Sequence, residues 1–123
     1  MAEEISKDMI RGHMDAVILN ILSQADSYGY EVSKTVKKLS ENQYEINEAT
    51  LYTVFRRLEK SGHIESYWGD ESQGGRRKYY KITATGLEKL ANARDSWQFA
   101  QKIITKLIMG TIENKGDDSW KIY

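Results

Sequence analysis

The spacing of apolar residues changes twice along this chain of 123 residues. Up to about residue 60 they recur every three or four positions, which is the period of an amphipathic helix. Between residues 64 and 82 they alternate with polar residues, as in a half-buried β-strand, and helical spacing returns from residue 84. The pattern predicts a mainly α (α+β) fold in which a β-ribbon lies between helices.

The first predicted helix spans about residues 6–23 and is apolar on two nearly opposite faces. One face holds Ile10, Met14, Val17, Ile18 and Ile21, and the other holds Ile5, Met9, Gly12, Ala16 and Leu19. A helix with two apolar faces is normally buried on both. Its own domain can cover one face, so we expect a second partner on the other.

Two further helices precede the ribbon. Ser27 is expected to cap the second helix, which continues to Leu39, and a weak alternation at residues 44–46 suggests a short strand. Asn47 is expected to cap the third helix, which runs to about Lys60 and ends at Ser61–Gly62. Its core face consists of Leu51, Val54, Phe55 and Leu58. Two helices joined by a short polar connection predict a helix-turn-helix.

The ribbon and the last helix complete the pattern. Strands at 64–68 and 78–82 flank a glycine-containing connection, which predicts a β-hairpin with a long tip. Thr83 or Thr85 can cap the last helix, which runs to about Met109. Its apolar seam consists of Leu90, Ala93, Trp97, Ala100, Ile104 and Leu107. A terminal helix with a continuous apolar seam is expected to pair with another helix. Residues 113–123 are expected to be a flexible tail.

The outer side of the third helix carries small residues, hydroxyls and cations, a mixture suited to a DNA major groove. The first turn of this helix can also direct backbone N–H groups at a phosphate. A second cationic stretch follows Gly74–Gly75 in the ribbon and can clamp the DNA backbone. The predicted DNA-contacting residues are Thr50, Tyr52, Thr53, Arg56, Arg57 and Lys60 on the helix, and Arg76, Arg77 and Lys78 in the ribbon.

The overall charge gives this interpretation little support, because 18 basic residues balance 18 acidic ones. Even residues 48–82, with seven basic and five acidic side chains, carry a net charge of only +2. Binding is therefore expected to need two copies of the chain and to weaken steeply with salt. Net neutrality leaves open an alternative, in which the fold is a protein-interaction module that does not bind DNA.

Two runs carry a family resemblance: EATLYTVFRRLEKSGHIESYW at residues 48–68 and GGRRKYYKITATG at 74–86. They resemble the PadR family of transcriptional regulators, in particular its short, multidrug-responsive members. The resemblance implies a winged helix-turn-helix with a two-stranded β-wing and a long C-terminal dimerisation helix. It divides the chain into a DNA-binding domain at 1–82, a dimerisation helix at 83–112 and the tail at 113–123.

The family also implies a homodimer that binds a palindromic double-stranded operator and represses a transporter, stress or detoxification gene. The final helix and the first helix would form the dimer, with contacts from Ile5, Met9, Leu90, Ala100, Ile104 and Leu107.

A ligand pocket is a further implication of the resemblance. In drug-binding members a tryptophan of the last helix stacks on planar aromatic ligands at the dimer centre, and Trp97 occupies that place here. Met9, Asp15, Ala16, Ala93 and Gln101 would line the same pocket. The acidic Asp15 suits a flat cationic compound. Periodicity alone makes Trp97 an interface residue, so both interpretations stay open.

Other classes of protein are disfavoured. The chain has no Cys and only two His residues, so disulfides, thiolate chemistry and a zinc site are not expected. No nucleophile–base pair or phosphate-cradling glycine motif occurs in a suitable context, so we expect neither an enzyme nor a cofactor. No apolar run approaches the ~20 residues of a membrane span and the first residues are acidic, which predicts a cytoplasmic protein.

Overall fold

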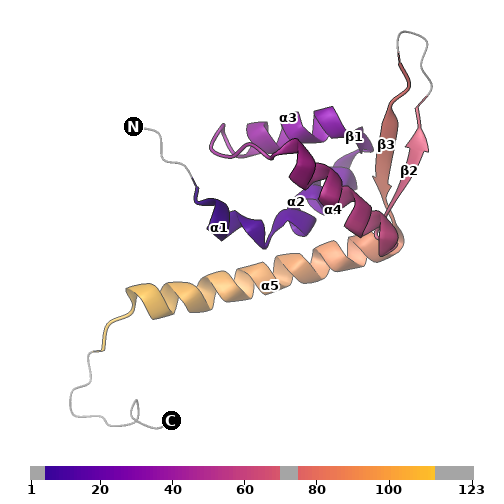
Figure 1. Cartoon of the computed structure of the whole chain (residues 1–123). Coiled ribbons are helices and arrows are strands. Elements are labelled where there is room, and N and C mark those ends of the chain that lie inside the picture. Colours follow the sequence, from indigo (N-terminus) through magenta and orange to yellow (C-terminus); the bar gives the residue numbers. More distant parts are fainter. Residues whose placement is uncertain (1–4, 70–74, 113–123) are drawn as a thin grey trace. The chain divides into compact units, whose positions relative to one another are not determined.

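The computed structural model describes residues 5–69 and 75–112 (Figure 1). The elements are α1 (Lys7–Arg11), α2 (Met14–Gln24), β1 (Ser27–Tyr28), α3 (Gly29–Leu39), α4 (Glu48–Lys60), β2 (Ile64–Trp68), β3 (Lys78–Ile82) and α5 (Ala84–Met109). The predicted tail at 113–123 and Gly74 lie outside the described residues. The described chain forms two compact units that divide between Ala93 and Arg94, within α5.

The helix expected at residues 6–23 is in fact two helices. α1 begins after Ser6, whose side chain accepts a hydrogen bond from the backbone N–H of Asp8, and it ends at Gly12. The N–H of His13 then donates to the carbonyl of Ile10 over 2.9 Å, which closes a turn before α2 begins. A glycine inside a helix lowers helix stability by about 1 kcal/mol relative to alanine, so the helix is expected to break at Gly12.

The break shortens the second apolar face predicted for residues 6–23. Leu19, expected on the second face, is completely buried in the core of its own unit. Ile5 and Met9 remain on that face, with 42% and 71% of their surface exposed. The second apolar face is therefore confined largely to α1 and the residues before it.

The helix-turn-helix forms from α3 and α4, with two corrections before them. Ser27 does not cap α3; it lies in β1, and its hydroxyl donates to Oε1 of Glu31. Residues 44–46 are not a strand, although Ile46 is buried in the core. Asn47 caps α4 as predicted, because its side-chain oxygen accepts from the N–H groups of the first turn.

The wing is β2 and β3, as predicted, but the sheet has a third strand that the sequence did not indicate. The strand order is β1-β3-β2 and both pairings are antiparallel. Tyr80 lies opposite both Ser27 and Ser66, and Tyr79 lies opposite both Tyr28 and Tyr67. Side chains of these two rows point to opposite faces, because successive residues of a strand alternate.

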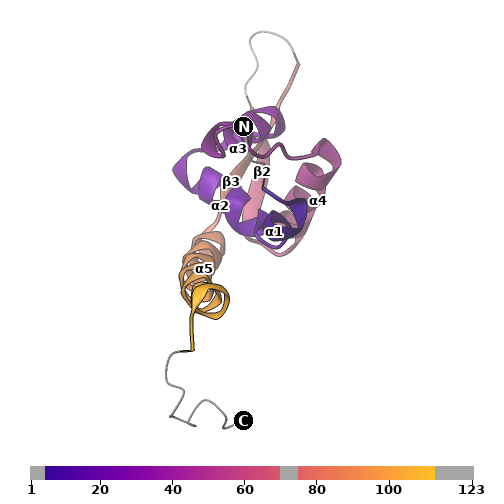
Figure 2. The ribbon, with the colours of Figure 1, turned by 90° about the vertical axis from the view of Figure 1, so that its left-hand side faces the viewer.

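The hydrophobic core lies where the helices meet one face of this sheet. Figure 2 shows α2, α3 and α4 grouped around β2 and β3, and α2 contacts β3 while α4 contacts β2. The ring of Phe55 stacks on Tyr80 with centroids 4.0 Å apart. Tyr80 and the four core residues predicted for α4 are all buried. The arrangement is a winged helix-turn-helix, as the sequence predicted.

The start of α5 is fixed to this unit. The N–H of Gly86 donates to the hydroxyl of Thr83, so Thr83 is the N-terminal cap. A Cβ on Gly86 would lie only 2.1 Å from the carbonyl oxygen of His63, so this position requires glycine. Leu90, predicted in the dimer seam, is only 2% exposed and belongs to the core. That prediction must be revised, because a side chain already packed in its own unit cannot contact another subunit.

Candidate nucleic-acid interface

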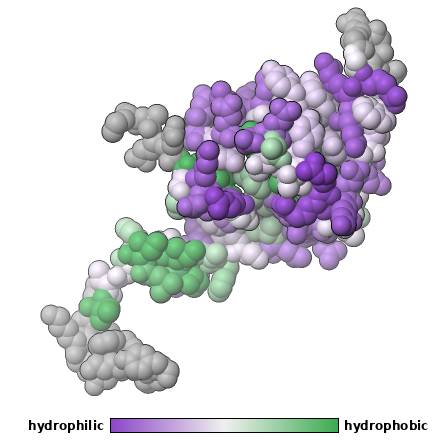
Figure 3. Space-filling model, in the orientation of Figure 1, coloured by the Kyte–Doolittle hydropathy of each residue, from purple (hydrophilic) through white to green (hydrophobic). Residues whose placement is uncertain are grey.

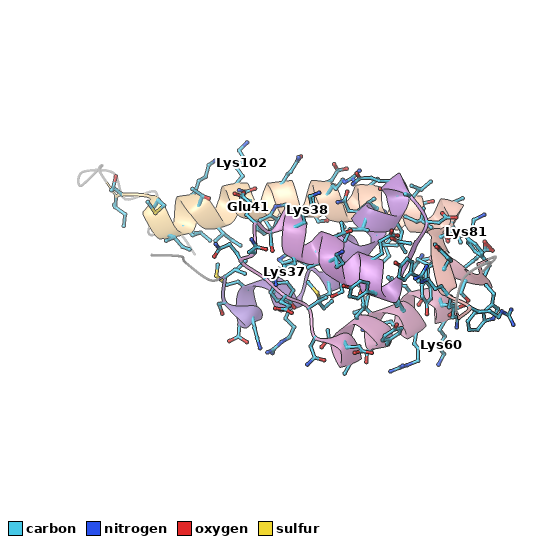
Figure 4. All side chains as sticks on the ribbon, turned by 90° about the horizontal axis from the view of Figure 1, so that it is seen from above. Lys37, Lys38, Glu41, Lys60, Lys81 and Lys102 are labelled. Carbon is cyan, nitrogen blue, oxygen red and sulfur yellow. The ribbon has the colours of Figure 1, made fainter. Side chains whose placement is uncertain are left out.

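The outer side of α4 presents its polar side chains to solvent. Thr50, Thr53, Arg56 and Lys60 are exposed, whereas the opposite face of the helix is buried. The Thr53 hydroxyl donates to the carbonyl of Ala49 over 2.8 Å and accepts from the guanidinium of Arg56 over 3.2 Å. Lys60 projects from the C-terminal end of the helix (Figure 4). The geometry therefore leaves a row of polar and cationic side chains along one accessible helix side.

The N-terminus of α4 is less available to an anion than the sequence predicted. The side-chain oxygen of Asn47 accepts from the N–H of Ala49 over 2.7 Å and from the N–H of Thr50 over 3.3 Å. Two of the N–H groups expected to meet a phosphate are thus occupied within the chain.

Tyr52 joins α4 to α3. A Cβ on Gly29 would lie 2.4 Å from the hydroxyl oxygen of Tyr52, so the absence of a side chain there makes room for the ring. The ring also packs edge-on against Phe55, with centroids 5.7 Å apart. Tyr52 is still 38% exposed, so it lies at the flank of the helix and has a packing role in addition to any contact with DNA.

Arg57 pairs with Asp15, which comes from α2. The guanidinium Nη2 of Arg57 donates to Oδ1 of Asp15, and the two side chains are 51% and 29% exposed. This contact joins a predicted DNA-binding residue to a predicted ligand-binding residue. It also balances the charge of Asp15 within the chain, which weakens the electrostatic reason for placing a cationic ligand beside it.

A hollow of about 280 Å³ adjoins this ion pair. Its lining consists of Arg11, Met14, Ala49, Thr50, Thr53, Val54 and Arg57. Arg11, which forms a 3.1 Å ion pair with Asp8, was not among the predicted site residues. No local pattern could have identified it, because only the packing of the N-terminal helices beside α4 brings it here.

Each of the three wing cations predicted to contact DNA lies over an aromatic ring. The guanidinium carbons of Arg76 and Arg77 are 4.8 Å from the centroids of Trp68 and Tyr28 respectively, and the Lys78 ammonium is 5.8 Å from that of Tyr80. Cations over ring faces are attracted by the ring quadrupole, by about 0.5–1 kcal/mol at exposed sites. All three cations remain exposed, so the rings support them without removing them from solvent.

Tyrosines cover the outer face of the sheet. Tyr79 packs edge-on against Tyr28 with centroids 5.4 Å apart and stacks on Tyr67 at 5.7 Å. The Tyr67 hydroxyl donates to Oδ2 of Asp26 over 2.6 Å, and this bond raises the pKa of Tyr67 above its usual value. Tyr28 therefore has a packing role.

The predicted ligand-binding residues are divided between the two compact units. Met9, Asp15, Ala16 and Ala93 belong to the first unit, and Trp97 and Gln101 belong to the second. Trp97 is 47% exposed and Met9 is 71% exposed. Their assembly into one pocket stays a prediction.

The second half of α5 has more exposed apolar surface than the predicted seam (Figure 3). Ile104 and Leu107 are 48% and 78% exposed, and Ala100 is partly exposed. Side chains that contact a second subunit are expected to be exposed in the single chain. The exposed apolar residues of this half outside the seam are Phe99, Ile103, Ile108 and Met109, and Ile112 is exposed after the helix ends. A single heptad stripe does not include them, because together with the seam they cover a broader arc of the helix.

Neither metal ligands nor a membrane span occur in the described part of the chain. No three acidic or histidine side chains converge there as metal ligands. None of the helices within residues 5–69 and 75–112 is both long and apolar enough to cross a bilayer.

Comparison with known proteins identifies the family. The model of the transcriptional regulator PadR-like family matches residues 18–92, which include α4, the wing and the beginning of α5. The chain belongs to the PadR-like family. It is therefore a DNA-binding transcriptional regulator and not an enzyme.

The chain is also similar to individual proteins over most of its length. A transcriptional regulator from Clostridium thermocellum is 45% identical, with a TM-score of 0.77 over 83% of this chain and 96% of the other. A PadR-like regulator from Bacillus cereus is 34% identical, with a TM-score of 0.73 over 85% and 99%. An uncharacterized protein X from Lysinibacillus sphaericus is 44% identical over 86% of this chain and 97% of its own.

The Escherichia coli transcriptional regulator YqjI is 28% identical over 80% of this chain. The aligned region spans only 46% of YqjI.

Proposed function

We propose that this PadR-like regulator is a homodimeric repressor that binds a palindromic operator. α4 lies in the major groove, where Thr50, Thr53, Arg56 and Lys60 meet base edges and phosphates. The wing places Arg76, Arg77 and Lys78 against the DNA backbone. The observation that carries the proposal is the exposed polar side of α4 in the same compact unit as three exposed wing cations. Because the protein acts on DNA, we also propose that it works in the cytoplasm.

Dimer formation is supported by the second half of α5. Leu107, Ile108 and Met109 are each more than 70% exposed, which is costly for side chains of this size in water. A second copy would bury this surface and would hold two α4 helices at successive major grooves, about 34–36 Å apart. We propose that the dimer contacts lie on α5 beyond Ala93 and on Ile5 and Met9, and that 1–82 with the first turns of α5 forms the DNA-binding domain.

We also propose that a planar ligand binds at Trp97 and relieves repression. Trp97 offers an indole face that is 47% exposed, on the same helix as the proposed dimer contacts. A ligand stacked between two such rings would relieve repression only by binding a subunit arrangement that fits the operator less well. The regulated gene would then encode a transporter or a stress or detoxification protein.

The test is a titration of a duplex covering the promoter of the protein's own gene, at two salt concentrations, with a scrambled duplex as control. We expect preference for the promoter and a steep loss of affinity with salt. Equal binding of the two duplexes at both concentrations would refute the proposal. Arg56→Glu with Arg76→Glu should abolish DNA binding while leaving the dimer intact. A protein-interaction module would instead keep its partner complex in this variant.

A further inference from the structure

The ion pair between Arg57 and Asp15 gives one cation of the candidate interface a carboxylate partner of its own. The pair joins α4 to α2, and Arg57 borders the hollow beside Thr50 and Thr53. Half of the Arg57 side-chain surface remains exposed, so an anion from solution can reach it. The guanidinium is therefore both accessible and already engaged.

A phosphate in the hollow would compete with Asp15 for the guanidinium of Arg57. Carboxylates and phosphates both accept from a guanidinium with the same fork geometry, so they compete for its N–H groups. The hydroxyl of Thr50 and the guanidinium of Arg11 line the same hollow, and both can donate to an oxyanion. The Thr53 hydroxyl also lines it but already donates to the carbonyl of Ala49. The lining contains no carboxylate. Its chemistry suits a phosphate group.

We infer that the hollow is a site for a backbone phosphate of the operator, and that Asp15 holds Arg57 in place of that phosphate until DNA binds. This inference rests on the proposed contact between α4 and DNA. Asp15 thereby lowers operator affinity: each subunit must exchange an internal ion pair for an external one. A carboxylate on α2 thus limits binding by a cation on α4.

The exchange also reduces the salt dependence of binding. A phosphate neutralised by a free cation releases a counterion and contributes about −0.9 to the slope of log affinity against log salt. When Arg57 leaves Asp15, the freed carboxylate attracts a cation from solution, which offsets part of that release. Removing the carboxylate should therefore both tighten binding and steepen its salt dependence.

Asp15→Asn is the direct test, with the full-length protein and the promoter duplex described above. We expect tighter binding by about two- to fivefold per subunit, the range of exposed and partly exposed ion pairs. The salt slope should become steeper by up to about 0.9 per subunit. Asp15→Ser provides a second neutral variant, and thermal unfolding by circular dichroism verifies that each variant is folded.

Two controls isolate the ion pair. Glu45→Gln removes the same charge from a more exposed pair with Lys37, and neither residue lines the hollow, so it should change affinity much less. In an Arg57→Gln background, Asp15→Asn should have almost no effect, because the cation it releases is gone. Three results would each overturn the inference: unchanged or weaker binding by Asp15→Asn, an equal effect of Glu45→Gln, or an undiminished effect of Asp15→Asn in the Arg57→Gln background. If the wild-type protein prefers the promoter and Asp15→Asn changes nothing, this inference alone is refuted. If the wild-type protein shows no preference for the promoter, the proposed function is refuted as well.

Discussion

Asn47 makes it possible to separate the stability of α4 from its affinity for DNA. Its side-chain oxygen accepts from the N–H groups of Ala49 and Thr50, at 2.7 and 3.3 Å. Asn47→Ala leaves both N–H groups to solvent, and loss of such a cap costs about 0.5–2 kcal/mol, typically near 1. For a domain of 60–100 residues, 1 kcal/mol corresponds to a fall in melting temperature of about 4–8 °C.

Asn47→Asp is the matched variant. A carboxylate can accept the same two hydrogen bonds, and a negative charge at a helix N-terminus adds about 0.3–1 kcal/mol of stability. The same charge repels DNA phosphates, so this variant should melt at or above the wild-type temperature while binding the promoter duplex more weakly.

The assay is thermal unfolding at one fixed protein concentration, because the melting temperature of a dimer depends on concentration. Fluorescence anisotropy with the labelled duplex supplies the affinities. An unchanged melting temperature in Asn47→Ala would contradict the capping role of Asn47. Wild-type affinity in Asn47→Asp would contradict its position close to DNA phosphates.

Three further predictions address the dimer, the ligand and pH. Leu107→Lys should shift the protein from dimer to monomer in analytical ultracentrifugation and weaken operator binding, whereas Lys106→Ala on the polar side of α5 should do neither. Trp97→Ala should weaken the binding of planar cationic dyes, followed by dye fluorescence, far more than operator binding; equal dye affinity would exclude Trp97 from the pocket. Burial, followed by the nearby Glu59 carboxylate, raises the pKa of Tyr80 above its usual value, so the folded state holds this proton more tightly than the unfolded state. The free energy of unfolding should therefore fall as pH rises above about 10, and urea titrations should show a smaller fall in Tyr80→Phe.

The helices and the wing were largely predictable because their signals are local. Asn47 and Gly62 mark the two ends of α4 through hydrogen bonds with residues two to four positions away. The four core residues of α4 follow the helical period within that helix. Alternation in β2 and β3 likewise appears within five residues. β1 has only two residues, too few to show any period, and it exists because Tyr79 and Tyr80 of β3 offer an unpaired edge.

The sequence by itself determined the polar side of α4, the cations of the wing and the long apolar α5, because helix and strand periods assign side chains to faces without reference to other elements. Only the tertiary structure paired Arg57 with Asp15, 42 positions apart in the chain, and brought Arg11 beside Thr50 and Thr53. It also buried Leu90 within its own unit and exposed Phe99 and Ile108. Partners and burial depend on which surfaces meet after the chain folds, and no periodicity along the sequence encodes that.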